Sequence, residues 1–205
     1  TEALRARATA EWGDQVMVEF CMRYGNPSTE DVLDRMVKAG CRRIVFLPLY
    51  PQYAGATSAT ANDQLFRALM AQKWQPAVRT IDPYFDRPDY IEALAGSVRR
   101  ALQNKTPTKL VASYHGMPKR YLLEGDPYHC QCRKTARLLA DALGRPVEVS
   151  FQSRFGRAKW LEPATDTRLE QLGREGRSVA IFAPGFSADC LETLEELAIR
   201  GKEQF

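Results

Sequence analysis

The stretch that decides the fold is KLVAS at residues 109–113, which continues into YHGMP at residues 114–118. The short apolar run is typical of a strand buried on both faces, as strands of parallel sheets are. His115 then comes just past the carboxyl end of this strand. Because open α/β sheets bind their ligands at that edge, we expect a functional site around His115.

Helical and strand patterns alternate along the rest of the chain. Helices are predicted over residues 1–12, 28–40, 57–72, 88–103, 128–143 and 165–174, and from about residue 189 onward. Strands are predicted over residues 15–23, 42–47, 77–81, 109–113, 147–151 and 178–183. Ser28 is expected to cap its helix, with Asp31 in the capping-box position. This alternation predicts an α/β protein with doubly wound, mostly parallel sheets.

The best candidate for a linker is KTPT at residues 105–108. It divides the chain into an N-terminal α/β half, residues 1–104, and a C-terminal α/β half, residues 105–205, that contains His115. The chain opens inside a helical pattern, so the first half is expected to be incomplete.

A row of acidic side chains follows the last predicted strand. Asp189, Glu192 and Glu196 are spaced i, i+3 and i+7, which places them on one face of a helix. Like charges stacked in this way repel by a few tenths of a kcal/mol per pair, and a cation would relieve the repulsion. Together with His115, the row therefore indicates a metal site.

An ordinary interpretation of the same residues stays open. Acidic residues in the first turn favour the positive end of any helix dipole, and Ser187 or Asp189 would serve as an N-cap. His115 by itself is also compatible with a buried histidine that is hydrogen-bonded to the backbone.

Composition limits the class of protein. The 205 residues carry 29 lysines and arginines against 25 acidic residues, a net charge of +4 that is too small and too dispersed to indicate nucleic acid binding. The pI of about 8.8 allows loose association with anionic membrane surfaces. The five cysteines show no framework spacing, and neither an export segment nor a membrane-spanning run is seen, so we expect a cytoplasmic protein. The oligomeric state is not predicted.

Two loops carry unusual residues. Residues 48–58 (PLYPQYAGATS) offer two tyrosines ahead of a helix start, and residues 153–160 (SRFGRAKW) add cations and an indole. A large, planar, apolar ligand with acidic side groups suits both loops. A Walker lysine and a G-x-G-x-x-G pattern are both missing from the sequence, which argues against a nucleotide.

Four motifs in order resemble the ferrochelatase family, whose members insert ferrous iron into a porphyrin at the end of haem synthesis. They are PLYPQY at residues 48–53, SYHGMP at 113–118 with GDPY at 125–128, FQSRFG at 151–156 with WL at 160–161, and PGF at 184–186 with the acidic row. The resemblance implies a chelatase-like fold of two Rossmann-like halves, the first incomplete. It also implies a lyase that inserts ferrous iron into protoporphyrin IX to form haem.

The resemblance also implies roles for individual residues. His115 and Glu192 match the two residues that are assigned to catalysis and to the metal. Asp189 and Glu196 match an acidic row that carries protons or metal. The residues that match the porphyrin pocket are Arg23, Tyr24, Tyr50, Tyr53 and Trp160.

Porphyrin and ferrous iron are the expected partners, and no organic cofactor is implied. Some relatives carry a [2Fe-2S] cluster, which needs four ligands. Here Cys130 and Cys132 form a C-x-C pair beside His129, and the usual C-x-x-C pairs are missing from the sequence. A plain pair of cysteines at a helix start is therefore favoured over a cluster.

Other functions remain open at this point. Arg154, Arg157 and Lys159 would suit coproporphyrin III, whose extra carboxylates demand more cations. The incomplete first half favours a fragment that binds a tetrapyrrole or metal without catalysis. A serine hydrolase built on Ser113 and His115 is disfavoured because the sequence lacks a G-x-S-x-G elbow.

Overall fold

The computed structural model describes residues 1–103 and 105–205, which form two compact units. Unit 1 contains Thr1–Pro48 and Gly55–Asp82, and unit 2 contains Leu49–Ala54 and Pro83–Phe205. Helix α4 (Pro88–Leu102) belongs to unit 2 because it packs against α6 (Tyr128–Leu143). The sequence analysis divides the chain after residue 104 instead. Residue 104 lies outside the described residues, and the division of the chain into halves at that point stays a prediction.

Unit 1 is built on a two-stranded parallel sheet. Its elements are α1 (Glu2–Trp12), the 3-10 helix η1 (Gly13–Gln15), α2 (Thr29–Lys38), β1 (Arg43–Phe46), α3 (Ser58–Ala71) and β2 (Ala77–Thr80). A small core of Leu33, Ile44 and Ala68 joins α2, β1 and α3. The predicted cap of α2 is confirmed, because the Asp31 backbone N–H donates to Ser28 Oγ at 3.1 Å.

The strand predicted over residues 15–23 is wrong. Val16 has extended backbone angles, as a strand requires, but the segment joins neither sheet of the described residues. The Val18 carbonyl accepts a hydrogen bond from the Arg5 side chain at 2.9 Å, and Met22 forms only an isolated bridge to Ser28. An extended pattern becomes a strand only where a neighbouring strand satisfies its backbone.

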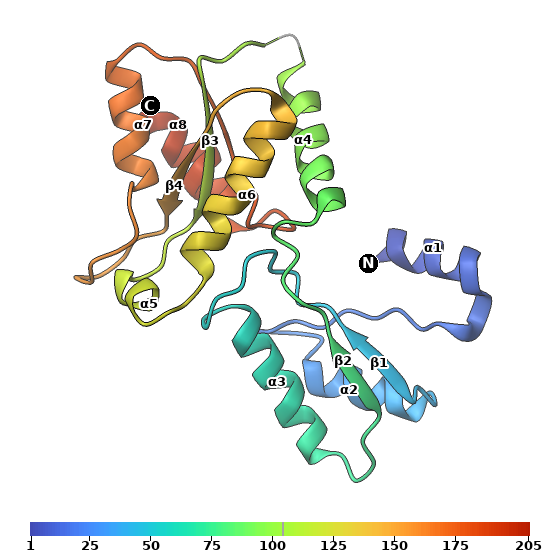
Figure 1. Ribbon diagram of the computed structural model, residues 1–205. Helices are drawn as coiled ribbons and strands as arrows, with labels where there is room; N and C mark the ends of the chain where they lie inside the picture. Colours follow the sequence, from blue (N-terminus) through green and yellow to red (C-terminus); the bar gives the residue numbers. More distant parts are fainter. Residues whose placement is uncertain (104) are drawn as a thin grey trace. The chain divides into compact units, whose positions relative to one another are not determined.

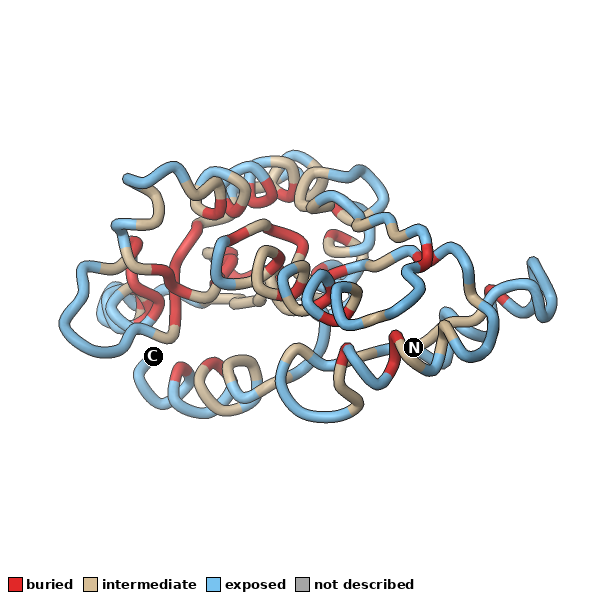
Figure 2. The backbone as a smooth tube through the Cα atoms, turned by 90° about the horizontal axis from the view of Figure 1, so that it is seen from below, coloured by how far each residue is buried: buried red, intermediate tan, exposed pale blue. Residues whose placement is uncertain are grey.

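Unit 2 contains a three-stranded sheet in the order β4-β3-β5, with all strands parallel (Figure 1). The strands are β3 (Lys109–His115), β4 (Val147–Gln152) and β5 (Val179–Phe182), and α7 (Thr165–Arg174) lies between β4 and β5 in the chain. The middle strand β3 is the most buried, as its apolar sequence predicts. The helices are buried along one side and exposed along the other (Figure 2). The predicted α/β class with parallel sheets is confirmed.

The strand order explains why the sheet is doubly wound. The chain passes from β3 to β4 through α6, and from β4 past β3 to β5 through α7. Crossovers between parallel strands are right-handed as a rule, so two that run in opposite directions place α6 and α7 on opposite faces of the sheet. The loops that follow β3 and β5 therefore leave toward opposite faces. Such a switch point is where open α/β sheets bind ligands.

Two features after the strands differ from the sequence-based expectation. A short helix that was not predicted, α5 (Lys119–Leu123), follows β3. The last helix begins later than expected, as the π-helix η2 (Glu192–Gly201), and ends in α8 (Lys202–Gln204). Asp189 therefore precedes the helix and does not share a helical face with Glu192 and Glu196. Among the described helices, none has the length and apolar character needed to cross a bilayer.

Candidate functional site

His115 is the last residue of β3, at the carboxyl edge of the sheet. Its backbone carbonyl accepts a hydrogen bond of 3.0 Å from the Tyr128 hydroxyl. Its Nδ1 lies 2.8 Å from the carbonyl oxygen of Gly116, which can only accept. Nδ1 therefore donates to this oxygen, and in the tautomer that this bond selects the lone pair is on Nε2. The backbone of the loop thus fixes which nitrogen is available for chemistry.

Glu192 is the residue that this nitrogen faces. Its carboxylate Oε1 lies 4.0 Å from His115 Nε2, and the two side chains are 33% and 40% exposed. Zn²⁺ bonds imidazole nitrogen and carboxylate oxygen at about 2.1 Å each, and ferrous iron accepts the same donor atoms. A single ion between the two atoms would reach both of them. The pair can also accept protons from a bound molecule.

The pair supplies two donor atoms for a metal ion, His115 Nε2 and Glu192 Oε1. Among the described residues, no cluster of three or more histidine, cysteine and acidic side chains is arranged around a metal position. Cys190 lies beside the pair, and burial followed by its contact with Glu192 raises the pKa of its thiol. The thiol is therefore protonated at neutral pH and is a poor metal ligand.

A series of hydrogen-bonded, buried polar side chains holds the backbone of Glu192. Ser113 Oγ donates to Gln152 Oε1 at 2.7 Å, and the Gln152 amide donates to the Glu192 backbone carbonyl at 2.9 Å. Ser113 also lies 2.8 Å from the hydroxyl of Thr165, which in turn bonds Ser150. All of these side chains except that of Glu192 are buried. Buried polar groups that are fully paired hold a single geometry, so this series fixes the start of η2 relative to β3.

Glu196 holds the loop after β4. Its carboxylate accepts hydrogen bonds from the Ser153 backbone N–H at 2.6 Å, from Ser153 Oγ at 2.5 Å and from the Gln152 amide at 3.2 Å. Ser153 has a φ of 62°, a left-handed conformation that non-glycine residues rarely adopt. These bonds help to hold the turn, and Glu196 is thereby tied to the same glutamine that bonds Glu192.

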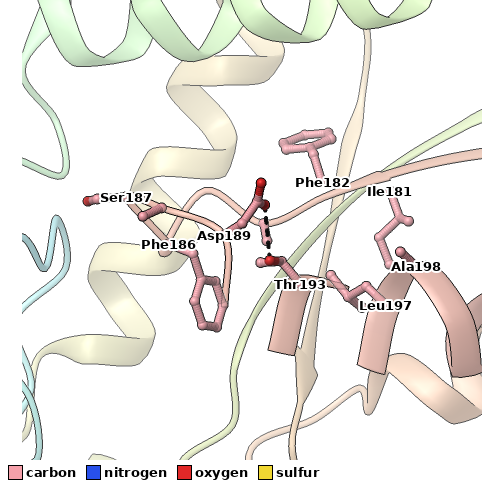
Figure 3. Close-up of a pocket in the computed structure, with 10 residues that line it drawn as sticks. Ile181, Phe182, Phe186, Ser187, Asp189, Thr193, Leu197 and Ala198 are labelled. Atoms are coloured by element: carbon pink, nitrogen blue, oxygen red, sulfur yellow. Dashed lines mark hydrogen bonds between the residues drawn. The ribbon is translucent and has the colours of Figure 1, made fainter. Parts of the chain in front are cut away.

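Asp189 lies in the loop between β5 and η2. Its Oδ1 accepts a hydrogen bond of 3.1 Å from Thr193 Oγ1, and neither Asp189 nor Ser187 caps the helix (Figure 3). Both line a cleft of about 450 Å³ together with apolar side chains such as Phe186 and Leu197. His115 and Glu192 do not line this cleft. The structure therefore brings His115 and Glu192 together and places Asp189 apart from them.

Trp160 packs beside the His115 loop. A Cβ on Gly116 would lie 3.2 Å from the Trp160 ring and 2.5 Å from the Gln152 carbonyl oxygen, so only glycine fits there. The Trp160 indole N–H donates to the Phe155 carbonyl at 3.1 Å, and the two rings are 4.9 Å apart. The indole thus lies next to the histidine loop.

The remaining predicted pocket residues fall in both units. Tyr50 and Tyr53 belong to the Leu49–Ala54 segment of unit 2, and both are half-buried. Arg23 and Tyr24 belong to unit 1, where the Arg23 guanidinium lies 4.5 Å from the centre of the Tyr24 ring. Arg23 also donates to Gln64 at 3.1 Å.

Sequence reasoning missed the supporting residues Ser113, Gln152 and Thr165. A usable signal was present, because Ser113 and Gln152 are polar residues within apolar strands, and Ser113 pairs in register with Ser150. A buried polar residue must find a hydrogen-bond partner, so such positions indicate a network.

Comparison with known proteins agrees with the motifs. The ferrochelatase family model matches residues 1–205. A protein named ferrochelatase from Rhodobacter capsulatus is 59% identical over 98% of this chain and 60% of its own length. A second, from Rhizobium meliloti, is 52% identical over 93% of this chain and 58% of its own length. The chain thus spans about 60% of the length of these curated relatives.

A solved structure shares the fold. SirB from Bacillus subtilis with Fe3+ aligns with a TM-score of 0.66 at 15% identity, covering 99% of this chain and 77% of that chain. At this identity the likeness supports the chelatase-like fold alone. The match of the family model to the whole chain, joined to relatives about half identical to it, shows that the chain belongs to the ferrochelatase family.

Proposed function

We propose that this chain carries the metal-insertion site of a lyase that places ferrous iron into protoporphyrin IX and forms haem, the last step of haem synthesis. One observation carries the proposal. In a member of the ferrochelatase family, Nε2 of His115 and Oε1 of Glu192 lie 4.0 Å apart at the ligand-binding edge of the sheet. Both side chains are open to a bound molecule.

The proposed chemistry follows from these two groups. Insertion of a divalent ion into a porphyrin releases two protons from the inner nitrogens. The Nε2 lone pair of His115 accepts one proton, and the Glu192 carboxylate accepts the other; if Glu192 instead holds the incoming iron, the second proton passes to water. Because Nδ1 is bound to the Gly116 carbonyl, the ring presents Nε2 without having to rotate. Iron is the substrate here and leaves with the macrocycle.

The acidic row has a proposed relay role. Asp189 is exposed and would attract cations toward the site. Glu196 shares the Gln152 amide with the Glu192 backbone, so a proton that leaves Glu192 has a second carboxylate close by. Two separate routes, one through each residue, fit these positions better than a single helical ladder.

The aromatic residues Trp160, Tyr50 and Tyr53 are proposed to bind the macrocycle, together with Arg23 and Tyr24. Aromatic faces suit a flat apolar ring, and Trp160 stands beside the histidine loop. Binding energy from the periphery of the ring can then bend the macrocycle and expose its nitrogens, at a strain of about 1–5 kcal/mol.

The pairing of Arg154 with Asp166 favours protoporphyrin IX over coproporphyrin III as the substrate. Its guanidinium donates to both carboxylate oxygens of Asp166, at 2.8 and 2.7 Å. An arginine that is already paired is less available for the additional carboxylates of coproporphyrin. Arg157 and Lys159 are exposed and could bind the additional carboxylates of coproporphyrin III, so both substrates are tested.

We propose that the reaction needs neither an organic cofactor nor a [2Fe-2S] cluster. The Cys132 thiol is buried, and burial raises its pKa well above the usual value. Such a group is a poor thiolate ligand. Cys130, the other member of the C-x-C pair, is exposed. A cytoplasmic location is proposed because all five cysteines are free.

The experiment is an anaerobic insertion assay on the 205-residue chain. Absorbance is followed as ferrous or zinc ion is added with protoporphyrin IX or coproporphyrin III, for the parent, His115→Ala and Glu192→Gln. We expect insertion to fall by at least about 100-fold in both variants, while porphyrin binding is retained. His129→Ala is the matched control, since His129 is the second of two histidines and stacks on Phe151.

The outcomes separate the alternatives. Unchanged rates in His115→Ala and Glu192→Gln contradict the assignment. A parent chain that binds porphyrin without metallation supports the non-catalytic alternative. A higher kcat/KM for coproporphyrin III than for protoporphyrin IX supports the second substrate.

A further inference from the structure

The segment Leu49–Ala54, which contains Tyr50 and Tyr53, is fixed to unit 2 by side chains from other elements. Pro51 and Gln52 are buried, so the segment is packed and not merely passing over the surface. Two of its fixing contacts come from the same face of α6.

The first contact is made by Gln131, in the first turn of α6. Its Oε1 accepts a hydrogen bond of 2.7 Å from the backbone N–H of Tyr53. The contact spans 78 positions of the chain and is partly buried. A backbone N–H that loses such a partner must find water or leave the geometry that it now has.

The second contact lies one helical turn further along. Gln52 donates from its amide to Thr135 Oγ1 at 3.1 Å, and Thr135 in turn donates to the Phe85 carbonyl at 2.7 Å. Residues 131 and 135 are spaced i and i+4, so they present neighbouring side chains on one face of α6. The tyrosine segment thus lies along a polar edge of this helix.

A third contact links the segment to the loop that carries Asp189. Ser187 Oγ donates to the Leu49 carbonyl at 2.9 Å. The segment is therefore held near both of its ends, at Leu49 and at Tyr53. The position of the tyrosine rings depends on a backbone that other side chains hold in place.

We propose that Gln131 is a positioning residue for porphyrin binding: by accepting the Tyr53 N–H it holds the segment in the conformation that presents Tyr50 and Tyr53 to the macrocycle. This inference rests on the proposed function, because only that function gives the tyrosines a ligand. Gln131 itself touches the Tyr53 backbone and is not assigned to the metal or to proton transfer. The proposal thus assigns a role to the middle residue of the Cys130-Gln131-Cys132 motif, and this role does not involve either cysteine.

The test uses three variants of the whole chain. Gln131→Leu removes the acceptor at similar size, Gln131→Glu keeps an acceptor oxygen, and Cys130→Ser changes an exposed neighbour as the control. Amide hydrogen exchange at Tyr53 reports the contact directly. The KM values for protoporphyrin IX and for Zn²⁺, with kcat, report its effect on the reaction.

In Gln131→Leu we expect Tyr53 exchange to accelerate about tenfold and the porphyrin KM to rise about five- to tenfold, as loss of one partly buried hydrogen-bond partner predicts. The KM for Zn²⁺ and kcat should stay within about twofold, because the His115–Glu192 pair is untouched. Gln131→Glu and Cys130→Ser should behave like the parent.

The inference is overturned if Tyr53 exchange is unchanged in Gln131→Leu, or if the porphyrin KM does not move although the exchange protection is lost. If the parent chain inserts no metal, the proposed function fails separately. The dissociation constant for protoporphyrin IX, from fluorescence quenching, then replaces KM and decides the inference together with the exchange rates. A parent chain that binds no porphyrin also overturns it.

Discussion

The side-chain amide of Gln152 donates a hydrogen bond of 2.9 Å to the backbone carbonyl of Glu192, so the last residue of β4 holds the first residue of η2. The same glutamine accepts from Ser113 at 2.7 Å. Since Ser113 lies two residues before His115 on β3, a single buried side chain connects the two strands to the helix that carries the carboxylate.

Gln152→Leu should therefore lower both stability and insertion. Loss of the amide leaves Ser113 Oγ and the Glu192 carbonyl without this partner, at a cost of about 2–4 kcal/mol in the free energy of unfolding. We expect kcat for metal insertion to fall more than the porphyrin KM rises, because Glu192 shifts relative to His115. Urea unfolding and steady-state kinetics check both.

Gln171→Leu is the control for this substitution, because Gln171 is exposed and bonds only its helical neighbour Glu175. It should change the unfolding free energy by less than about 0.5 kcal/mol. Equal effects of the two substitutions would contradict a special role for Gln152.

Gly116→Ala should disturb the site by steric overlap. The new Cβ would lie 2.5 Å from the Gln152 carbonyl oxygen and 3.2 Å from the Trp160 ring. Overlap with backbone cannot be relieved by a rotamer change, so we expect a loss of about 1–3 kcal/mol in stability and a shifted tryptophan fluorescence spectrum.

The matched glycine is Gly96, in the middle of α4, where a Cβ would meet only the end of the flexible Arg100 side chain at 3.4 Å. Gly96→Ala should stabilise the chain by about 0.4–1 kcal/mol. If both glycines tolerate alanine equally well in thermal unfolding, the packing described around Gly116 is incorrect.

Glu148 should make the stability of unit 2 depend on pH. Partial burial raises the pKa of Glu148, but hydrogen bonds from Lys109 and Arg168 outweigh it, and the net shift is downward. A carboxylate with a lowered pKa stabilises the fold above its unfolded pKa, and this contribution is lost as pH falls through the folded pKa. Glu148→Gln should therefore flatten the loss of stability below about pH 4.5, the ordinary pKa of the group.

The measurement is the unfolding free energy of the parent and Glu148→Gln at several pH values between neutral and acid. The parent should be more stable at neutral pH by about 1 kcal/mol, and the difference should shrink as the pH falls. Glu170→Gln, at the exposed helical pair with Arg174, serves as comparison. A difference that is constant with pH would contradict the ion-pair assignment.

Asp166→Asn should change the choice of porphyrin. Partial burial raises the pKa of Asp166, but hydrogen bonding to Arg154 outweighs it, and the net shift is downward, so the pair is ionised at neutral pH. Removing the carboxylate leaves the guanidinium charge without its partner. We expect the KM for coproporphyrin III to fall about threefold or more, with a smaller change for protoporphyrin IX.

Arg154→Gln alone should leave both KM values within about twofold and lower stability by less than about 1 kcal/mol, because the pair is well exposed. A large increase in the KM for protoporphyrin IX would mean that Arg154 already binds that substrate.

The regular elements could largely be predicted from sequence, because their patterns are local. The helices Tyr128–Leu143 and Thr165–Arg174 begin and end at the residues that the sequence pattern predicts. The segment at residues 15–23 shows the limit of such reasoning, since an apolar run cannot tell whether a partner strand is present. The late start of η2 is a second case: the spacing of Asp189 and Glu192 fits a helix, but the loop after β5 holds Asp189 through Thr193 instead.

The site could be predicted in part. His115 and Glu192 can be identified from the motifs, and the adjacency of β3 and β5 brings the loops that follow these strands to one edge of the sheet, but their 4.0 Å separation is set by the fold. The partners of Gln152 and Gln131 could not be predicted, because their contacts join positions 40 and 78 residues apart. Contacts of that kind depend on the finished fold and leave no periodic trace in the sequence.

The register of β3 has a consequence for how firmly each donor is held. β3 pairs with β4 as far as His115 and Gln152, but with β5 only as far as Ala112 and Phe182. The His115 imidazole is thus attached to a strand that is paired up to its last residue. The Glu192 carboxylate is attached to a helix that follows β5, whose pairing with β3 ends earlier. Substitutions in η2 should accordingly move the Glu192 carboxylate more readily than changes in β3 move the His115 ring.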